Sequence, residues 1–478
     1  MKRYLILQVL FVISLITEAQ EPYYTGLILD DEAYEQIQRK PELLTRDYTV
    51  LPRSYSLQKY CPEVKSQSQY GTCTSWATAY AARTIIEAVN NGWTSQEQIT
   101  REAFSPIFVY AQIKNEDDLN CQQGSYIGDA FELLKTKGVP KFSLFDVLCA
   151  NEIGQELFST ASVYKIDDYF TLFSYSCNSY NEKINKTKKA ISQNCPVVIS
   201  MKVYPSFHTA KEAWNGYVAA GEKPGNHAMC VVGYDDDMNG GSFLIMNSWG
   251  TYWGNNGFTW VTYQDYFKYV SYAVEMYVRK KAVPTPQPQP KPQPQPVPQP
   301  IKKNVMSGSM RLQLSGGEDM KVTYDPSYIP HYKANEEYIS GTRYRIYVSN
   351  GEPAYVYIIG SDLKNSVSKV FPSTDKISPA LVYKSSNIAI PDEKWYIEMD
   401  DTKGKDYVCV LYSCNALPID SIVKKIKEGQ GSFYDKLKSA LSGRLVSSTD
   451  VSYGRDEITF CAETEATIIP FIVEITHR

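Results

Sequence analysis

Hydrophobic positions follow a helical repeat early in the chain and a strand pattern further on. Apolar residues recur every three or four positions over residues 72–90, an Ala-rich stretch that ends at Asn91-Gly92. This pattern predicts a buried helix, and a second helix is predicted over residues 130–137. After residue 195, apolar and β-branched runs bounded by turn residues predict strands over residues 196–203, 227–234 and 242–249. Helices followed by strands indicate an α+β fold.

A proline-rich segment divides the chain. Residues 284–300 read PTPQPQPKPQPQPVPQP, with proline at every second position. Such a segment favours polyproline II and predicts an extended linker of roughly 50 Å. The expected organisation is a signal peptide at 1–19, an N-terminal strap or short pro-segment at 20–60, a first domain at 61–283, the linker at 284–300 and a second domain at 301–478.

The second domain has the alternating pattern of β-structure. Residues 343–360 form two strand-like runs around Asn350-Gly351, and this dipeptide between such runs predicts a β-hairpin. Further strands are predicted over residues 394–401, 407–413 and 467–476, and short helices near 418–428 and 432–441. We therefore predict a β-rich, sandwich-like domain with small helices.

The N-terminus has the three regions of a secretory signal peptide. Lys2 and Arg3 precede an apolar run from Leu5 to Ile16, and the small residue Ala19 follows. The apolar run is shorter than the ~20 residues that span a bilayer. We expect an exported protein, either periplasmic or secreted.

Charge and composition narrow the class of function. The chain of 478 residues has 49 Lys and Arg against 53 Asp and Glu, for a net charge of −4. This balance excludes the basic surface of a typical nucleic-acid binder, so no nucleic-acid partner is expected. The hydrophobic fraction of 43% is that of a globular protein.

Two residue types in the first domain suggest nucleophilic catalysis. Cys73 follows Gly71-Thr72 and begins the predicted helix, where the helix dipole and free backbone N–H groups favour a thiolate. Only His208 and His227 in this domain could act as a base that titrates near neutrality. His227 begins a predicted strand, whereas His208 lies in a looser segment and is expected to be an ordinary surface or core residue.

The order of these motifs resembles the papain-like cysteine peptidases over about residues 60–280. Gln67 stands six residues before Cys73, Asn226-His227-Ala228 follows later, and the string NSWGTYWGNNGF begins at Asn247. The resemblance implies an α+β papain-like fold, with a helical subdomain and a β-barrel-like subdomain. It also implies a cysteine peptidase that needs no cofactor and no metal.

The resemblance also implies a role for each matching residue. Cys73 would be the nucleophile, His227 the base and Asn247 the group that orients the imidazole. Gln67 would donate to the oxyanion, together with the backbone N–H of Cys73.

Three further positions match the substrate-binding residues of the family. Gly124 and Asn226 would hydrogen bond the substrate backbone. Trp249 would cover the hydrogen bond between the catalytic histidine and asparagine.

Several positions depart from the family pattern. Thr74 replaces the usual aromatic residue after the nucleophile, Tyr70 replaces a cysteine, and Gln123 replaces the first of two glycines. The variants look like those of a divergent bacterial member. Among the other cysteines, a bridge between Cys121 and Cys149 is preferred from their rough position.

The second domain is similar to a domain of unknown function that is appended to bacterial signalling and peptidase proteins. The similar strings are VYIIG (356–360), VFPS (370–373) and IAIPDEKW (388–395). We expect this domain to bind a cell-surface, glycan or protein partner.

These observations predict an exported cysteine endopeptidase that acts on a peptide or protein substrate. Two alternatives stay open. One is an amide hydrolase or acyl transferase acting on cell-envelope peptides. The other is a surface binding protein with an accessory peptidase module.

Overall fold

The structure describes most of both predicted domains. The computed structural model covers residues 23–280, 304–327, 331–362 and 366–478. The predicted signal peptide and the proline-rich linker lie outside the described residues. Within the described ranges, we find no helix with the length and apolar content needed to cross a membrane.

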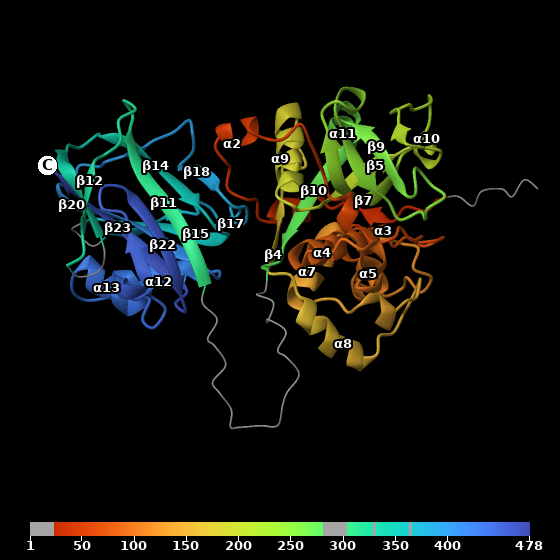
Figure 1. The fold of residues 1–478 in the computed structure, drawn as a ribbon, viewed down its shortest axis with the longest axis horizontal. Coiled ribbons are helices and arrows are strands. Elements are labelled where there is room, and N and C mark those ends of the chain that lie inside the picture. Colours follow the sequence, from red (N-terminus) through yellow and green to blue (C-terminus); the bar gives the residue numbers. More distant parts are fainter. Residues whose placement is uncertain (1–22, 281–303, 328–330, 363–365) are drawn as a thin grey trace, which may run out of the picture.

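Helices cluster in the first part of the N-terminal domain and at one side of the C-terminal domain (Figure 1). Those of the N-terminal domain are α1 (Asp31–Gln36), α2 (Arg46–Thr49), α3 (Cys73–Ser75), α4 (Thr84–Asn91), α5 (Gln96–Arg101), α6 (Pro106–Ile113), α7 (Ile127–Thr136), α8 (Gln155–Ala161), α9 (Tyr180–Ser192), α10 (Pro205–His208) and α11 (Tyr263–Tyr269). Those of the C-terminal domain are α12 (Ile419–Glu428) and α13 (Phe433–Ala440).

The helix predicted over residues 72–90 is present and has three parts. The α-helical turn α3 leads into a π-helical segment, Trp76–Arg83, which continues into α4. Gly92 ends α4 in the left-handed conformation, with φ of 68°, and its N–H bonds the last turn. Small residues such as Ala79 and Ala82 let this helix pack deep in the core against β7. The nucleophile candidate therefore stands on a rigid, buried element.

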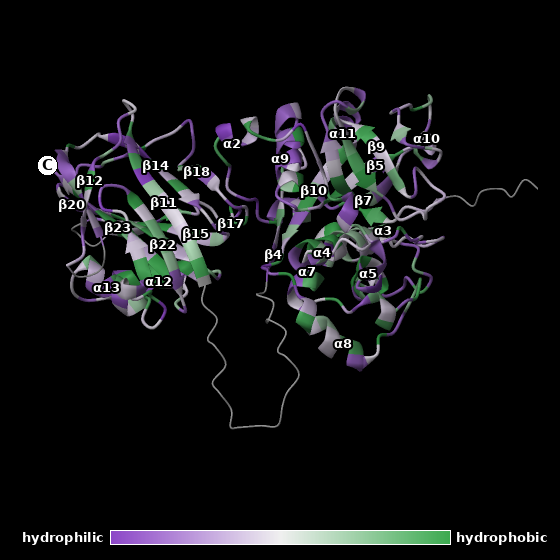
Figure 2. Cartoon of the chain, in the orientation of Figure 1, coloured by the Kyte–Doolittle hydropathy of each residue, from purple (hydrophilic) through white to green (hydrophobic). Residues whose placement is uncertain are grey.

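A mixed sheet forms the second half of the N-terminal domain. Its strands, in spatial order, are β4 (Asp168–Thr171), β10 (Val270–Tyr277), β5 (Val197–Val203), β7 (Gly225–Asp235), β8 (Ser242–Met246), β9 (Phe258–Thr262) and β6 (Ala213–Trp214), and β2 (Ser54–Ser56) also pairs with β7. All three strands predicted in this region are present, as β5, β7 and β8. Their hydrophobic residues lie in the core. Figure 2 shows the hydrophobic residues of the chain in green.

The C-terminal domain consists of two packed sheets. The first contains β18 (Ser386–Ile390), β14 (Arg343–Asn350), β11 (Asn304–Leu314), β22 (Ile458–Thr464), β21 (Val451–Tyr453) and β19 (Ile397–Glu398). The second contains β12 (Val322–Asp325), β13 (His331–Tyr338), β23 (Ile468–His477), β20 (Gly404–Ser413), β15 (Ala354–Ser361), β16 (Val367–Phe371) and β17 (Ala380–Leu381). The prediction of a β-rich, sandwich-like domain is confirmed, and α12 and α13 cover the outer face of the second sheet.

The predicted hairpin around Asn350-Gly351 is wrong. Strands β14 and β15 form at the predicted positions, but β14 pairs with β11 and β18, and β15 pairs with β20 and β16. The chain crosses from one sheet to the other at this turn. The Asn350 side chain stabilises the crossing by donating to the carbonyl groups of Leu381 and Tyr383, at 3.2 and 2.8 Å.

The chain ahead of β2 forms a strap, defined here as residues 23–49. The strap begins at the N-terminal domain, where β1 (Leu27–Ile28) pairs in parallel with β3 (Ser125–Tyr126). It then continues through α1 to α2, which lies between the two domains (Figure 1). Val50, directly after the strap, is 77% exposed.

The two domains also contact each other directly. Phe170 of β4 packs with Tyr355, Tyr357 and Ile359 of the C-terminal domain. Arg279 donates to the backbone carbonyl of Cys414 and to the Asn415 side chain. In the structure the domains are therefore in contact, although the sequence of the linker predicts an extended spacer between them.

Candidate active site

Cys73 lies at the first position of α3, with its side chain fully buried. Burial raises the pKa of the Cys73 thiol, and hydrogen bonds from the backbone N–H groups of Ala228 and Gly26 oppose that rise. The contact with Ala228 brings the sulfur next to the residue that follows His227 in β7. The helix end thus brings the thiol to the segment of β7 that carries His227.

The His227 imidazole is oriented by Asn247, which follows β8. The His227 Nε2 and Asn247 Oδ1 atoms are 2.7 Å apart, and Asn247 Oδ1 also accepts from the Ser248 backbone N–H at 2.8 Å. Because this oxygen can only accept, the Nε2 atom carries the proton. The buried Nδ1 atom has no hydrogen-bond partner among the described residues. It is therefore free to accept a proton from a neighbouring thiol.

The surroundings of His227 disfavour its charged form. Burial lowers the pKa of His227 to about 4, and the bond to Asn247 opposes this only in part. The indole of Trp249 stacks on the imidazole, with ring centroids 4.5 Å apart. Trp249 thus covers the bond between His227 and Asn247, as the resemblance implied.

Gln67 is fully buried, and its amide has a fixed orientation. Its Oε1 atom accepts from the Ser248 hydroxyl at 2.6 Å, so its Nε2 atom is the donor at the other end of the amide. This nitrogen donates to the carbonyl groups of Tyr70 at 2.7 Å and Tyr24 at 3.2 Å. Ser248 lies within the NSWG string, but its role in positioning Gln67 was not predicted from that string.

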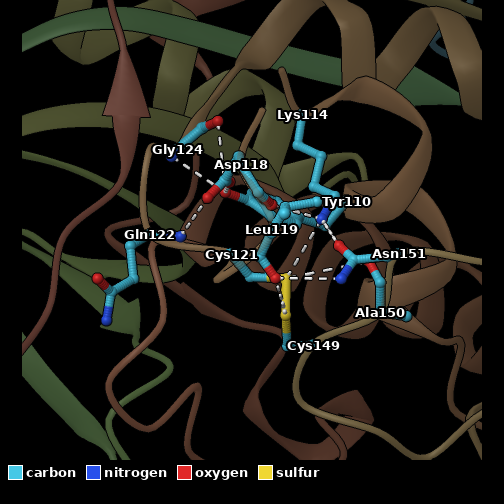
Figure 3. Close-up of a disulfide and its surroundings, with 10 residues drawn as sticks. All are labelled: Tyr110, Lys114, Asp118, Leu119, Cys121, Gln122, Gly124, Cys149, Ala150 and Asn151. Carbon is cyan, nitrogen blue, oxygen red and sulfur yellow. Dashed lines mark hydrogen bonds between the residues drawn. A yellow bond between two sulfur atoms is a disulfide. The ribbon is translucent and has the colours of Figure 1, made fainter. Parts of the chain in front are cut away.

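Gly124 belongs to a wall against which the strap packs, because a Cβ atom on Gly124 would lie under 3.0 Å from the Gly26 carbonyl oxygen. Its φ of +87° favours glycine, and its N–H donates to the Tyr110 hydroxyl at 3.0 Å (Figure 3). That hydroxyl donates in turn to the buried Asp118 carboxylate at 2.5 Å. This support was not predicted, because the sequence does not show that Tyr110, Asp118 and Gly124 meet.

A disulfide holds the same wall. Cys121 is bonded to Cys149, which confirms the bridge preferred from the sequence (Figure 3). The carbonyl of Cys121 accepts from the Gly71 N–H at 2.8 Å, so the bridged loop also supports the turn before the nucleophile. The wall and the nucleophile are therefore held in one hydrogen-bonded unit.

The strap packs against this wall and against Gln67 and Trp249, and we call the space that it fills the cleft. The Gly26 carbonyl accepts from the Ser125 N–H at 2.9 Å, and Leu27 is only 5% exposed. The Tyr24 carbonyl accepts from Gln67 Nε2 and, at 3.1 Å, from Trp249 Nε1. The sequence left open whether this segment is a pro-segment or a strap on the fold, and the structure places it across the candidate catalytic residues.

The remaining candidates lie at the edge of the same cleft. Asn226 pairs with Lys202 between β7 and β5, next to His227. His208 packs edge-on against Trp249 and against Tyr23 of the strap, with centroids 5.3 and 5.7 Å apart. His208 therefore contacts Trp249 and the strap, next to the candidate catalytic residues, and is not a separate surface residue.

Comparison with known families separates the two domains. Residues 51–278 match the model of the papain family cysteine proteases. Residues 337–415 match a domain of unknown function, DUF4384. The predicted resemblances are thus confirmed for both domains.

Individual relatives match the N-terminal domain. The gamete and mating-type specific protein A of Dictyostelium discoideum is 28% identical over 208 residues, which are 42% of this chain and 41% of that protein. An uncharacterized peptidase C1-like protein of Acanthamoeba polyphaga mimivirus is 26% identical over 202 residues, 40% of this chain and 61% of that protein. The matches thus span about two fifths to three fifths of these relatives.

Solved structures overlap the same part of the chain. Xylellain, a cysteine protease from Xylella fastidiosa, is 20% identical with a TM-score of 0.44, covering 54% of this chain and 96% of that one. A digestive procathepsin L 3 of Tenebrio molitor is 18% identical with a TM-score of 0.39, covering 54% and 84%.

Proposed function

We propose that the chain is an exported cysteine endopeptidase that uses Cys73, His227, Asn247 and Gln67, because residues 51–278 match the model of the papain family cysteine proteases. One observation carries the assignment of the catalytic residues. The His227 Nε2–H is engaged by Asn247, and the buried Nδ1 atom has no hydrogen-bond partner among the described residues, while the backbone of the next residue, Ala228, contacts the Cys73 thiol.

The first chemical step follows from this arrangement. The Cys73 thiol transfers its proton to His227 Nδ1, and the resulting thiolate attacks the carbonyl carbon of the scissile peptide bond. The carbonyl oxygen becomes an oxyanion, which accepts from the backbone N–H of Cys73 and from Gln67 Nε2. Such donors are often worth about 3 kcal/mol in the transition state.

In the steps that follow, His227 gives its proton to the leaving amine, and the Cys73 thiol is later restored. The His227 imidazolium protonates the leaving amine, which departs and leaves a thioester on Cys73. A water molecule then gives a proton to His227 and attacks the thioester, which releases the acid and restores the thiol. Asn247 keeps the ring in one orientation throughout, and Trp249 shields their hydrogen bond from water.

The proposed location and substrate rest on other observations. Export is supported by the sequence of residues 1–19, and a peptide or protein substrate by the peptidase family. For the C-terminal domain we keep the proposal of a protein, glycan or cell-surface partner. Its exposed Trp395, 69% accessible, is a candidate contact residue.

The test is reaction with an epoxide that alkylates active-site thiols, followed by cleavage of a peptide library. Both are measured in wild type and in Gly26→Ala, which is designed so that the strap cannot seat. We expect label on Cys73 and hydrolysis within peptide chains. His227→Ala should abolish hydrolysis, whereas His208→Ala should retain it within about tenfold. Full hydrolysis in Cys73→Ala, or cleavage confined to cell-wall peptides, would overturn the proposal.

A further inference from the structure

The strap is held by both domains along its length. Its first residues occupy the cleft, as described above. Its middle is held on the N-terminal domain by Tyr34, which stacks on Tyr272 with centroids 4.1 Å apart. The Tyr34 hydroxyl donates to the Phe173 carbonyl at 2.9 Å, and Tyr272 donates to Asp31 at 2.5 Å. These contacts join the cleft segment rigidly to the residues that follow.

The strap is bonded to the C-terminal domain from Arg39 onward. The Arg39 N–H donates to the Lys376 carbonyl at 2.9 Å, and the Arg39 carbonyl accepts from the Ser378 N–H at 2.8 Å. The Leu44 N–H donates to the Asn387 carbonyl at 2.8 Å. Here the C-terminal domain satisfies backbone groups of the strap, as a neighbouring strand would.

Side chains add a second set of bonds at the same place. The buried Asp47 carboxylate accepts from the Asn387 backbone N–H at 2.9 Å and from its side chain at 3.0 Å. The Glu393 carboxylate accepts from the Thr45 N–H and hydroxyl, at 2.9 and 2.7 Å. Hydrogen bonds to charged groups are stronger than neutral ones, so this end of the strap is firmly held.

Lys40 connects all three parts of the molecule. Its amine forms an ion pair with the fully buried Glu275 of β10 and lies 3.4 Å from the ring centroid of Tyr383. The Tyr383 hydroxyl donates to the same carboxylate at 2.5 Å. If the strap left, Glu275 would lose its cation while still buried against the C-terminal domain. Because an unpaired buried carboxylate is costly, this ion pair favours the docked strap.

We propose that the C-terminal domain is a latch that keeps the strap in the cleft. The contacts at Arg39, Leu44 and Asp47 contribute to docking of the whole strap, because Tyr34 and α1 link them to the cleft segment. A partner that competes for the Asn387 surface would therefore open the cleft. By reciprocity, occupation of the cleft by substrate would loosen the grip of the C-terminal domain on the strap. The inference rests on the proposed function only in its consequence for peptidase activity.

The latch is tested in the full chain with Asn387→Ala and, separately, Glu393→Ala. The first readout is the rate at which iodoacetamide alkylates Cys73, resolved by mass spectrometry, with the exposed Cys461 as internal reference. The second is hydrogen exchange of the Ser125 amide, which bonds the Gly26 carbonyl. We expect both to rise about tenfold. Arg343→Ala, which breaks an ion pair with Glu398 elsewhere on the same domain, should change neither.

The outcomes separate the latch from the proposed function. Alkylation and exchange do not need catalysis, so a rise in both without peptide hydrolysis would leave the latch standing and contradict the peptidase. Glu393 is exposed, so its replacement tests the latch even if Asn387→Ala fails to fold. If the Leu44 amide exchanges faster in these variants while Cys73 and Ser125 stay protected, the C-terminal contacts do not control the cleft and the proposal is wrong.

Discussion

Replacing Gly26 with alanine should expel the strap from the cleft. A Cβ atom on Gly26 would lie under 3.0 Å from the carbonyl oxygen, the carbonyl carbon and the Cα atom of Gly71. All three are backbone atoms of the turn that precedes Cys73, and that turn is fixed by its bond to Cys121, so neither side can move aside cheaply. Overpacking of this kind costs about 1–3 kcal/mol. The open fraction should rise about 5- to 150-fold, provided that the strap is mostly docked in the wild type.

The assay is the second-order rate of Cys73 alkylation, together with kcat/KM for a fluorogenic peptide. Ile28→Ala is the matched control, because Ile28 lies two residues further along the strap but is 39% exposed and loses little contact. Thermal unfolding checks that the domains stay intact. An alkylation rate for Gly26→Ala equal to that of wild type would refute the idea that the strap closes the cleft.

Three further predictions follow from the site and the interface. Gln67→Ala should lower kcat about 10²-fold with little change in KM, because the oxyanion exists only in the transition state. Gln69 is exposed, so Gln69→Ala should leave both constants unchanged. An effect of Gln67→Ala on KM alone would contradict this. The pKa of His227 is about 4 in the folded protein, so its imidazole stays neutral there, whereas in the unfolded chain it gains a proton below about pH 6.5. The free energy of unfolding should therefore fall as the pH drops from 6.5 to 4. At about pH 4.5 this titration should lower the free energy of unfolding by about 2–3 kcal/mol. The measurement is denaturation across pH of Cys73→Ala and of the double variant Cys73→Ala, His227→Gln, which lacks the titrating group. Identical pH profiles of the two proteins would contradict the prediction. Tyr383→Phe should cost about 1–3 kcal/mol in denaturation because Glu275 loses a buried donor, whereas Tyr252→Phe, at 95% exposure, should cost nothing measurable.

The candidate catalytic residues could be proposed from the sequence because their signals are local. Cys73 is marked by the turn before its helix, and Asn247 by the string that follows its strand. The folding of each motif also depends on nearby residues, such as Gly92 at the end of α4. The papain-like fold of the first domain and the β-rich second domain were therefore predictable.

The position of the strap was not predictable in the same way. The bonds between Tyr24 and Gln67 join residues 43 positions apart, and those between Asp47 and Asn387 span 340 positions. The wrong hairpin at Asn350 has the same origin, since the dipeptide describes a turn but not which strands pair across it. One signal was present: Tyr23 to Ile28 is an aromatic and apolar stretch with a glycine, and such a segment needs a surface to cover it.

The exposure of Val50 has a consequence for how closure depends on concentration. While the chain is continuous, the strap rebinds its own cleft at an effective concentration that is typically millimolar, so dilution of the protein has no effect. A single cut at Val50 would turn the strap into a separate peptide, and its binding would become a bimolecular equilibrium. Dilution would then open the cleft of the cut form and leave the intact form closed, and alkylation of Cys73 across a dilution series distinguishes the two.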